Sequence, residues 1–283
     1  MQRQKSFIDA KPTLYLVPTP IGNLEDMTFR AIKTLQTVDY IAAEDTRVTK
    51  KLCNHFEIAT PLVSLHEHNE WQKREWVINQ LQQGKNIALV SDAGMPCISD
   101  PGVQLVEAVL AHNLPVVPLP GANAALTALI ASGLTPQPFY FYGFLAHKKS
   151  EKKKQLAQLE PLATTLVFYE SPHRIKETLQ LMLDGFGDRR IVLARELTKK
   201  FEEFLRGSIS EVLEECDGLK GEMVIIVEAG SGAQADIWWE AYNVSQHVEH
   251  YIDQGMMTKD AIKQAAVDRQ VPKKIIYSEY HQL

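Results

Sequence analysis

The sequence predicts an α/β protein made of two α/β domains and a small C-terminal helical extension. Short apolar runs alternate with helical patterns as far as Val227, which is typical of sheets covered by helices. At 283 residues the chain is also long for a single core. After the loop at 229–235 the pattern becomes helical only. We therefore expect domains at 1–120, 121–232 and 233–283.

Composition and charge narrow the classes of function. The net charge of −5 argues against a uniformly basic nucleic-acid binder, although a local basic patch is compatible with it. No apolar run approaches the ~20 residues of a membrane span. The N-terminal MQRQKSFIDAKP lacks the apolar core of a signal peptide, so we expect a cytoplasmic protein. Cys53, Cys97 and Cys216 lack CxxC spacing, which favours free thiols.

The first expected strand is LYLV (14–17), and PTPIGN (18–23) follows it. A turn that binds a dinucleotide phosphate uses backbone N–H groups, and Pro18 and Pro20 have none. The chain also lacks GxxxxGK[ST], the phosphate-binding loop of many nucleotide hydrolases. Both observations argue against a nucleotide phosphate at this turn.

The rest of the first domain alternates helices and strands. This alternation calls for a mostly parallel sheet covered on both faces. Gly84 stands in the usual C′ position at the end of one helix. The expected strands are YIAA (40–43), LVSL (62–65), IALV (87–90) and PVVPL (115–119). The expected helices carry Ile32, Leu35 and Val38; Val48, Leu52 and Phe56; Val77, Ile78 and Leu81; and Val103, Val106, Val109 and Leu110.

Four strand ends should meet at one edge of this sheet, because parallel strands share the edge where ligands bind. These ends are the segments 18–23, 43–47, 90–102 and 120–124. The loop VSDAGMPCISDPG (90–102) carries Asp92 and Asp100 but no Lys or Arg, so a neutral or cationic ligand fits it better than an anionic one. The alternative is that both carboxylates only cap the loop and the following helix.

S-adenosylmethionine suits such an edge, because it has no phosphate and carries a positive sulfonium. Asp92 is placed to accept hydrogen bonds from the ligand's ribose hydroxyls or amino group. Gly94 and Ala122 leave room for backbone contact with an adenine ring.

The second domain is expected to begin with a small-residue helix at 125–132. Its expected strands are FYFYGF (139–144), LVFY (166–169), IVLA (191–194) and MVIIV (223–227). The segment HKKSEKKK (147–154) either contacts RNA phosphates or is a solvated helix start. In ESPHR (170–174), Ser171 and Pro172 are predicted to be the N-cap and first residue of a helix.

Helical patterns fill the C-terminal extension. Trp238, Tyr242, Val248 and Ile252 suggest one helix, and the stretch 257–280 reads as two helices broken at Val271 and Pro272. The spacing of Ala261 and Ala265 before that break is compatible with a helix-turn-helix or with ordinary packing.

A metal site is not predicted. His66 and His68 point the same way if the strand before them continues, but the spacing offers no third ligand.

Seven stretches in one order resemble a known family. They are LYLVPTPIGNLEDMT, AEDTRVTKKL, SLHEHNE, VSDAGMPCISDPG, PLPGANAALTAL, FYESPHRI and ARELTKKFEE, and they span Leu14 to about Glu203. The sequence is similar to the tetrapyrrole-methylase-type, or class III, methyltransferases, and within them to the bacterial ribosomal RNA small subunit methyltransferase I family.

The resemblance implies two α/β domains with S-adenosyl-L-methionine in the cleft between them, and a homodimer. It also implies 2′-O-methylation of a cytidine, in the cytidine 1402 region of the decoding centre of 16S rRNA, so that the small ribosomal subunit is the partner. The implied cofactor contacts are Ile21, Asp92, Ala93, Gly94, Met95, Ala122, Asn123, Ala124, Phe168 and Tyr169.

A ribose 2′-OH is a poor nucleophile until its proton is removed, so a nearby base would help. The candidates are Glu44, Asp45, His66 and Glu170, with Arg47, Arg174 and Lys199 to position phosphate or pair with these carboxylates. The alternative is that AEDTR and ESPHR form salt-bridged scaffolding. A small-molecule tetrapyrrole methylase and a non-catalytic RNA-binding protein remain competing interpretations.

Overall fold

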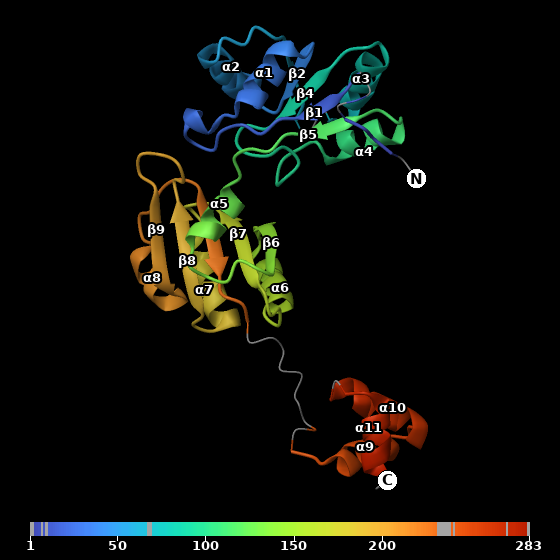
Figure 1. Cartoon of the computed structure of the whole chain (residues 1–283). Coiled ribbons are helices and arrows are strands. Elements are labelled where there is room, and N and C mark those ends of the chain that lie inside the picture. The colour runs from blue at the N-terminus through green and yellow to red at the C-terminus, as the bar shows by residue number, and fades with distance from the viewer. Residues whose placement is uncertain are drawn as a thin grey trace. The chain divides into compact units, whose positions relative to one another are not determined.

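The computed structural model describes residues 3–6, 8, 11–66, 70–230, 239, 241–269 and 271–281 (Figure 1). By its internal contacts the chain separates into two units. The first contains Met1–Glu160 and Thr164–Gly230, and the second contains Pro161–Ala163 and Ser231–Leu283.

The first sheet of unit 1 has five strands in the order β3-β2-β4-β1-β5. They are β1 (Leu14–Leu16), β2 (Tyr40–Ala43), β3 (Leu62–Ser64), β4 (Ile87–Val90) and β5 (Val116–Pro118). Every pairing is parallel, which confirms the predicted sheet type. All five strands therefore end at the same edge, and the loops that follow them start there.

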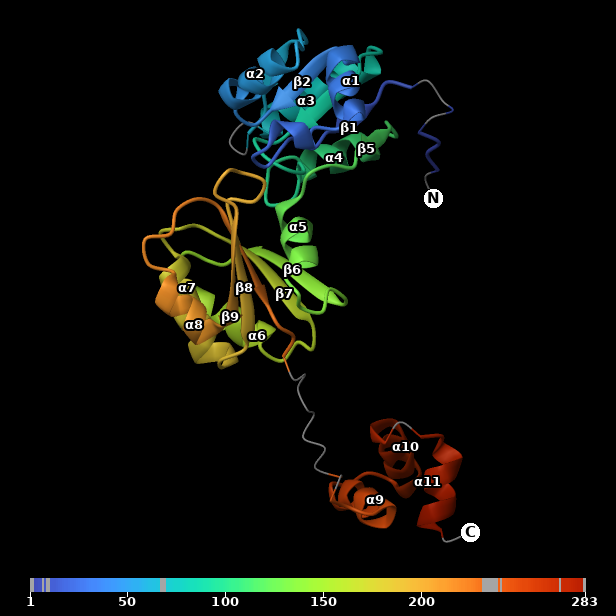
Figure 2. The ribbon, with the colours of Figure 1, turned by 60° about the vertical axis from the view of Figure 1, so that its left-hand side comes forward.

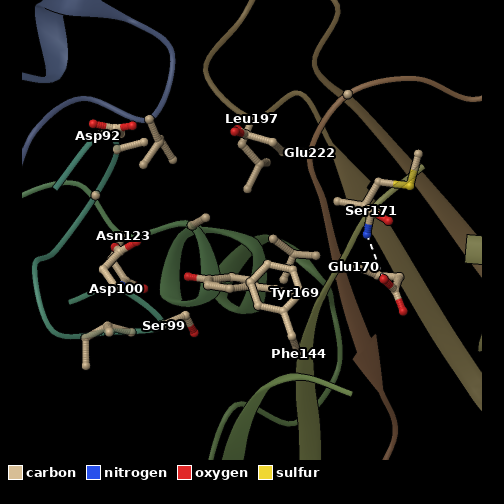
Figure 3. Close-up of a pocket in the computed structure, with 18 of the residues that line it drawn as sticks. Asp92, Ser99, Asp100, Asn123, Phe144, Tyr169, Glu170, Ser171, Leu197 and Glu222 are labelled. Atoms are coloured by element: carbon tan, nitrogen blue, oxygen red, sulfur yellow. Dashed lines mark hydrogen bonds between the residues drawn. The ribbon is translucent and has the colours of Figure 1, made fainter. Parts of the chain in front are cut away.

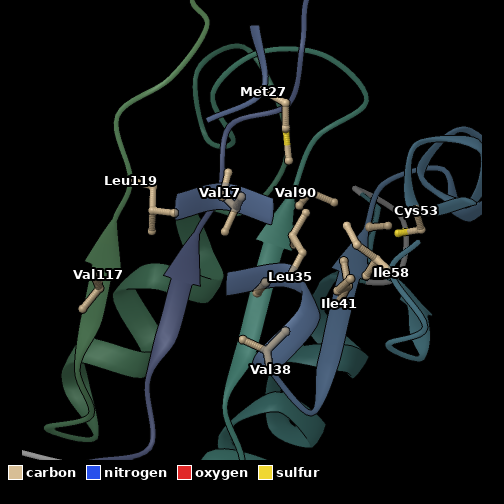
Figure 4. Packing of buried hydrophobic residues seen from close by; sticks show 13 residues of the cluster. Val17, Met27, Leu35, Val38, Ile41, Cys53, Ile58, Val90, Val117 and Leu119 are labelled. Carbon is tan, nitrogen blue, oxygen red and sulfur yellow. The ribbon is translucent and has the colours of Figure 1, made fainter. Parts of the chain in front are cut away.

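Helices cover both faces of this sheet. They are α1 (Phe29–Thr37), α2 (Thr46–His55), α3 (Glu70–Gln82) and α4 (Val103–Ala111), with a short 3-10 helix η1 (Leu24–Asp26). On one face Leu35 of α1 and Val38, the C-cap of that helix, pack with Ile41 and Val90 (Figure 4). On the other face Leu81 of α3 and Val109 of α4 pack with the opposite side of the same strands. Because both faces are buried, the strands are apolar runs.

The second sheet is mixed, with the order β6-β7-β10-β8-β9. Strand β6 (Phe139–Phe144) runs parallel to β7 (Thr165–Glu170). Strands β8 (Arg190–Arg195), β9 (Glu203–Ser208) and β10 (Met223–Val227) make antiparallel pairings. Helix α5 (Ala124–Ala131) covers one face, and α6 (Lys149–Leu159), α7 (Ile175–Phe186) and α8 (Ile209–Glu215) lie toward the other (Figure 2).

The predicted start of α7 is wrong by three residues. Ser171 is not the N-cap and instead lies in a turn ahead of the helix, in which its carbonyl accepts hydrogen bonds from the N–H groups of Arg174 and Ile175. Its own N–H donates to the carboxylate of Glu170. The helix starts at Ile175, and Arg174 is its N-cap.

Unit 2 is a bundle of α9 (Val244–Asp253), α10 (Thr258–Asp268) and α11 (Lys273–Tyr280). The predicted break before α11 is confirmed. Ala261, Ala265 and Ile276 are buried in its core, so the two alanines serve close packing. Tyr242 precedes α9, and Trp238 lies outside the described residues. Within the described part of the chain, no helix is both long and apolar enough to cross a membrane.

Candidate active site

Unit 1 holds a cavity of about 530 Å³ where loops of the first sheet meet the second sheet (Figure 3). Loops after β1, β2, β4 and β5 supply one part of its lining. Strands β6, β7 and β10, the turn after β7, the loop after β8 and the residues just before β10 supply the rest. The lining residues are Ile21, Glu44, Asp92, Ala93, Gly94, Met95, Ile98, Ser99, Asp100, Asn123, Ala124, Phe144, Tyr169, Glu170, Ser171, Pro172, Glu196, Leu197, Lys199, Gly221, Glu222, Met223 and Val224.

The loop after β1 and the loop after β4 are joined by backbone hydrogen bonds. Thr19 and Gly94 each donate an N–H to the other's carbonyl, at 2.9 and 3.0 Å. Gly94 has a φ of +81°, a left-handed conformation that glycine adopts without strain. The Thr19 hydroxyl also donates to the carbonyl of Ser91. These contacts fix the loop bearing Asp92 at the cavity wall.

The lining is strongly acidic. It contains six carboxylates, from Glu44, Asp92, Asp100, Glu170, Glu196 and Glu222, and Lys199 is the one Lys or Arg among the lining residues. Burial and the nearby charge of Asp92 raise the pKa of Glu44. Burial, followed by the charge of Glu44, raises the pKa of Asp100 to about 6. This electrostatic environment favours a positively charged ligand and disfavours phosphate.

The loop after β8 joins the second sheet to the first. The backbone N–H of Asn23 donates to the hydroxyl of Thr198 at 3.0 Å. The Lys199 ammonium lies 2.9 Å from Glu196 Oε1 and 3.3 Å from Glu222 Oε2. Burial alone would lower the pKa of Lys199, but these two carboxylates outweigh it and raise that pKa. The lysine therefore neutralises part of the acidic lining.

Glu170 is held by four neighbours. Its Oε1 accepts the N–H of Ser171 at 2.8 Å and lies 3.1 Å from Arg174 Nε. Its Oε2 accepts the Thr178 hydroxyl at 2.6 Å and lies 4.0 Å from Lys152 Nζ. Both oxygens are thus engaged, which favours a scaffolding role for Glu170 over that of a proton acceptor.

Lys152 and Thr178 are both fully buried in this network. The Lys152 ammonium donates to Thr178 Oγ1 at 2.8 Å and to Glu177 Oε1 at 3.1 Å. Its side chain has no exposed surface. One lysine of the segment 147–154 therefore points into the protein and is not available to RNA phosphates.

Besides Lys199, the structure brings ten of the sixteen other sequence-predicted site residues to the cavity. The lining includes Ile21, Glu44, Asp92, Ala93, Gly94, Met95, Asn123, Ala124, Tyr169 and Glu170. It does not include Asp45, Arg47, His66, Ala122, Phe168 or Arg174.

The residues outside the lining have other surroundings. The side chain of Asp45 caps α2 and pairs with Arg47, which holds the pKa of this carboxyl at about 2. Phe168 is fully buried and packs on Tyr142, because adjacent strand residues point to opposite faces and Tyr169 takes the cavity side. His66 follows β3, and its charge acts to lower the pKa of Glu44.

Sequence reasoning missed most of the lining contributed by the second sheet. Phe144, Leu197 and Glu222 carry no recognisable signal, whereas Asp100 was expected in the ligand loop and Lys199 as a partner of carboxylates. The signal that was needed is strand register: Met223 of β10 lies opposite Glu170 of β7. That pairing places the first residues of β10 beside the last residues of β7. The register of an antiparallel pair depends on both strands, so the sequence of one strand does not predict it.

Metal ligands do not cluster in the described residues: no group of three His, Cys, Asp or Glu side chains there could hold an ion. His68 lies outside the described residues.

Comparison with known proteins identifies the family. The model of the Tetrapyrrole (Corrin/Porphyrin) Methylases matches residues 13–213. The chain is 58% identical over 288 residues to "Ribosomal RNA small subunit methyltransferase I" of Bacillus subtilis, covering 99% of both chains. It is 54% identical to the protein of that name from Halalkalibacterium halodurans, covering 100% of both.

A solved structure of uroporphyrin-III-C-methyltransferase from Thermus thermophilus shares the fold. Its TM-score is 0.57 at 19% identity, over 77% of this chain and 94% of that one. The family model covers both sheets except the last strand, and the relatives extend through the helical unit. The chain therefore belongs to the tetrapyrrole methylase family and, within it, to the ribosomal RNA small subunit methyltransferase I family.

Proposed function

We propose that this protein uses S-adenosyl-L-methionine to methylate the 2′-oxygen of a cytidine ribose in the decoding centre of 16S rRNA. The observation that carries the proposal is full-length identity above 50% to relatives named for ribosomal RNA small subunit methylation. The match includes the C-terminal helices as well as the two sheets. A small-molecule methylase would need no such extension.

The cavity fits this methyl donor. S-adenosylmethionine supplies an electrophilic methyl group on a positive sulfonium, and six carboxylates with one lysine suit that charge. Small residues such as Gly94 and Ala124 leave room for its flat adenine. The residues proposed to hold it are Ile21, Asp92, Ala93, Gly94, Met95, Asn123, Ala124 and Tyr169.

Methyl transfer forms an O–C bond as the C–S bond breaks, so holding the 2′-hydroxyl in line supplies much of the rate. Its proton must pass to an acceptor. Of the four acceptors that the sequence suggests, we propose Glu44. It lines the cavity and burial raises its pKa, whereas Asp45 pairs with Arg47, Glu170 has both oxygens engaged and His66 does not line the cavity.

We also propose that the protein is a cytoplasmic homodimer. Leu126 and Ile130 on α5 are apolar and exposed, Ile130 by 81%, as expected for a surface that a second copy covers. Light scattering coupled to gel filtration tests the mass. A monomer at micromolar concentration would contradict the homodimer and leave the reaction unaffected.

The direct experiment incubates small ribosomal subunits lacking the modification with methyl-labelled S-adenosylmethionine. We expect label in 16S rRNA, at a ribose resistant to alkaline cleavage. Subunits that already carry the methyl group are the control. Absence of label would contradict the proposal, and salt-dependent RNA binding without calorimetric heat from S-adenosylmethionine would favour a non-catalytic RNA-binding protein.

A further inference from the structure

Strand β6 contains a bulge beside the cavity. In its parallel pairing with β7, Phe141 lies opposite Val167, and Gly143 lies opposite Phe168. Tyr142 is therefore the extra residue of β6. Gly143 has a φ of +81°, a left-handed conformation that a bulge often requires of glycine.

The bulge changes which way Phe144 points. Residues three apart on a regular strand face opposite sides of the sheet. Yet Phe141 and Phe144 both contact the ring of Tyr169, with centroids 5.0 and 5.6 Å away. The ring of Tyr142 lies on the other side, 5.7 Å from Phe168. The extra residue thus turns Phe144 toward the cavity.

Phe144 lines the cavity and yet is 52% exposed. A phenylalanine left so open forgoes part of the stabilisation that burial would give. The aromatic rings of the cavity lining are those of Phe144 and Tyr169. Tyr169 is flanked by Phe141 and Phe144, so Phe144 offers the more open ring surface. Figure 3 shows the rings of Phe144 and Tyr169 side by side in the lining.

The loop after β4 reinforces this arrangement. A Cβ at Gly143 would lie 3.1 Å from the hydroxyl of Ser99, so the bulge and this loop approach closely. Ser99 has a φ of +61°, a strained conformation for serine. The bulge that directs the ring of Phe144 toward the cavity therefore packs against a strained loop that lines the same cavity.

We propose that Phe144 is the stacking platform for the nucleobase of the nucleotide that is methylated. This inference rests on the proposed function. The base is joined to C1′, next to the reacting C2′ position, so a bound ribose brings its base to the same cavity. Bases recognised in RNA are splayed out and stacked on aromatic side chains. The acidic lining repels phosphate, which leaves the base as the part of the nucleotide that an apolar ring can hold.

Phe144 belongs to the edge strand of the second sheet, whereas most of the small residues suited to the methyl donor belong to loops of the first sheet. Loss of its ring should therefore affect the RNA more than the donor. This difference separates a base-stacking role from contact with the donor's adenine.

The test uses the full-length protein with Phe144→Ala, Phe144→Leu and Phe144→Trp. Phe139→Ala is the matched control, because Phe139 lies on the same strand, is 39% exposed and does not line the cavity. We expect Phe144→Ala to raise the KM for small ribosomal subunits roughly tenfold, as loss of one base stack does. Calorimetry should give an unchanged Kd for S-adenosylmethionine. Phe144→Trp should restore the KM to within about threefold, because its ring also stacks.

Phe144→Leu guards against a folding defect, since leucine fills space but has no flat ring. It should match Phe144→Ala in KM and the wild type in thermal unfolding. A wild-type KM in Phe144→Leu, or a weakened donor Kd with unchanged KM, would overturn the inference. If the wild-type protein itself labels no RNA, the proposed function fails first, and that result is distinct from either.

Discussion

Asp92 accepts a hydrogen bond through Oδ1 from the backbone N–H of Asp45, at 3.1 Å. The two residues follow β4 and β2, which are neighbouring strands. One carboxylate therefore braces two loops and also faces the cavity. A substitution by asparagine separates its two roles, because asparagine keeps an oxygen that can accept the hydrogen bond but carries no charge.

Asp92→Asn should keep the brace between the two loops and weaken S-adenosylmethionine binding. A hydrogen bond to a charged group contributes about 1.5–3 kcal/mol, so we expect the Kd to rise by roughly 10- to 100-fold. Calorimetry measures the Kd and urea denaturation checks the fold. Asp92→Ala, which also removes the brace, should lose stability as well. Unchanged donor affinity in both variants would remove Asp92 from the site.

Asp100 should make the stability depend on pH. Its folded pKa of about 6 exceeds the ordinary 3.8, so the folded protein holds the proton more tightly than the unfolded chain. The resulting stabilisation is present below pH 3.8 and is lost as pH rises through 6. Asp100→Asn cannot ionise, so its free energy of unfolding should lack this fall. Urea denaturation from pH 4 to 8 tests this. Parallel curves for the two proteins would contradict it.

Thr178→Val should destabilise the protein by about 1–3 kcal/mol, because it removes the hydroxyl that joins Lys152 to Glu170 in a buried site. Thr178→Ser keeps that hydroxyl and should cost less than about 1 kcal/mol. Urea denaturation compares the pair. We also expect a lower kcat/KM in Thr178→Val, since the turn that Glu170 holds lines the cavity. Equal losses in both variants would show that packing, and not the hydroxyl, matters.

Gly22→Ala should disturb the contact between the first loop and the loop after β8. A Cβ there would overlap the Lys199 side chain and lie 2.9 Å from Thr198 Oγ1. Overpacking of this kind costs about 1–3 kcal/mol. The double variant Gly22→Ala/Lys199→Ala removes the first overlap, so it should lose less stability than the sum of its single changes. Strict additivity in denaturation would contradict the expected contact.

The first sheet was predictable because its strands are buried on both faces and because prolines and glycines in its loops mark where the strands and helices end. Runs such as IALV (87–90) have few alternatives to a central strand. The proline- and glycine-rich loop after it can be neither strand nor helix. Parallel order then brings Asp92 and Glu44 to one edge without knowledge of side-chain contacts.

Two features of the second domain, strand β9 and the burial of Lys152, could not be predicted from the sequence. Strand β9 (Glu203–Ser208) has no continuous apolar run, because it is an edge strand with one neighbour and with exposed or half-buried residues. Lys152 looks like its neighbours in a lysine run, and its burial depends on a carboxylate and a hydroxyl from β7 and α7. These outcomes are set by contacts between distant segments.

The bulge in β6 makes one edge of the cavity depend on the backbone conformation of a single residue, Gly143. If β6 were a regular strand that kept Tyr142, Phe141 and Phe144 would stand three positions apart, and strict alternation would turn the ring of Phe144 to the face of the sheet opposite Tyr169. Deleting Tyr142 would instead leave them two positions apart and on the same face. A substitution that disfavours the left-handed conformation of Gly143 is thus a means by which related enzymes can change one wall of the pocket while keeping the sheet.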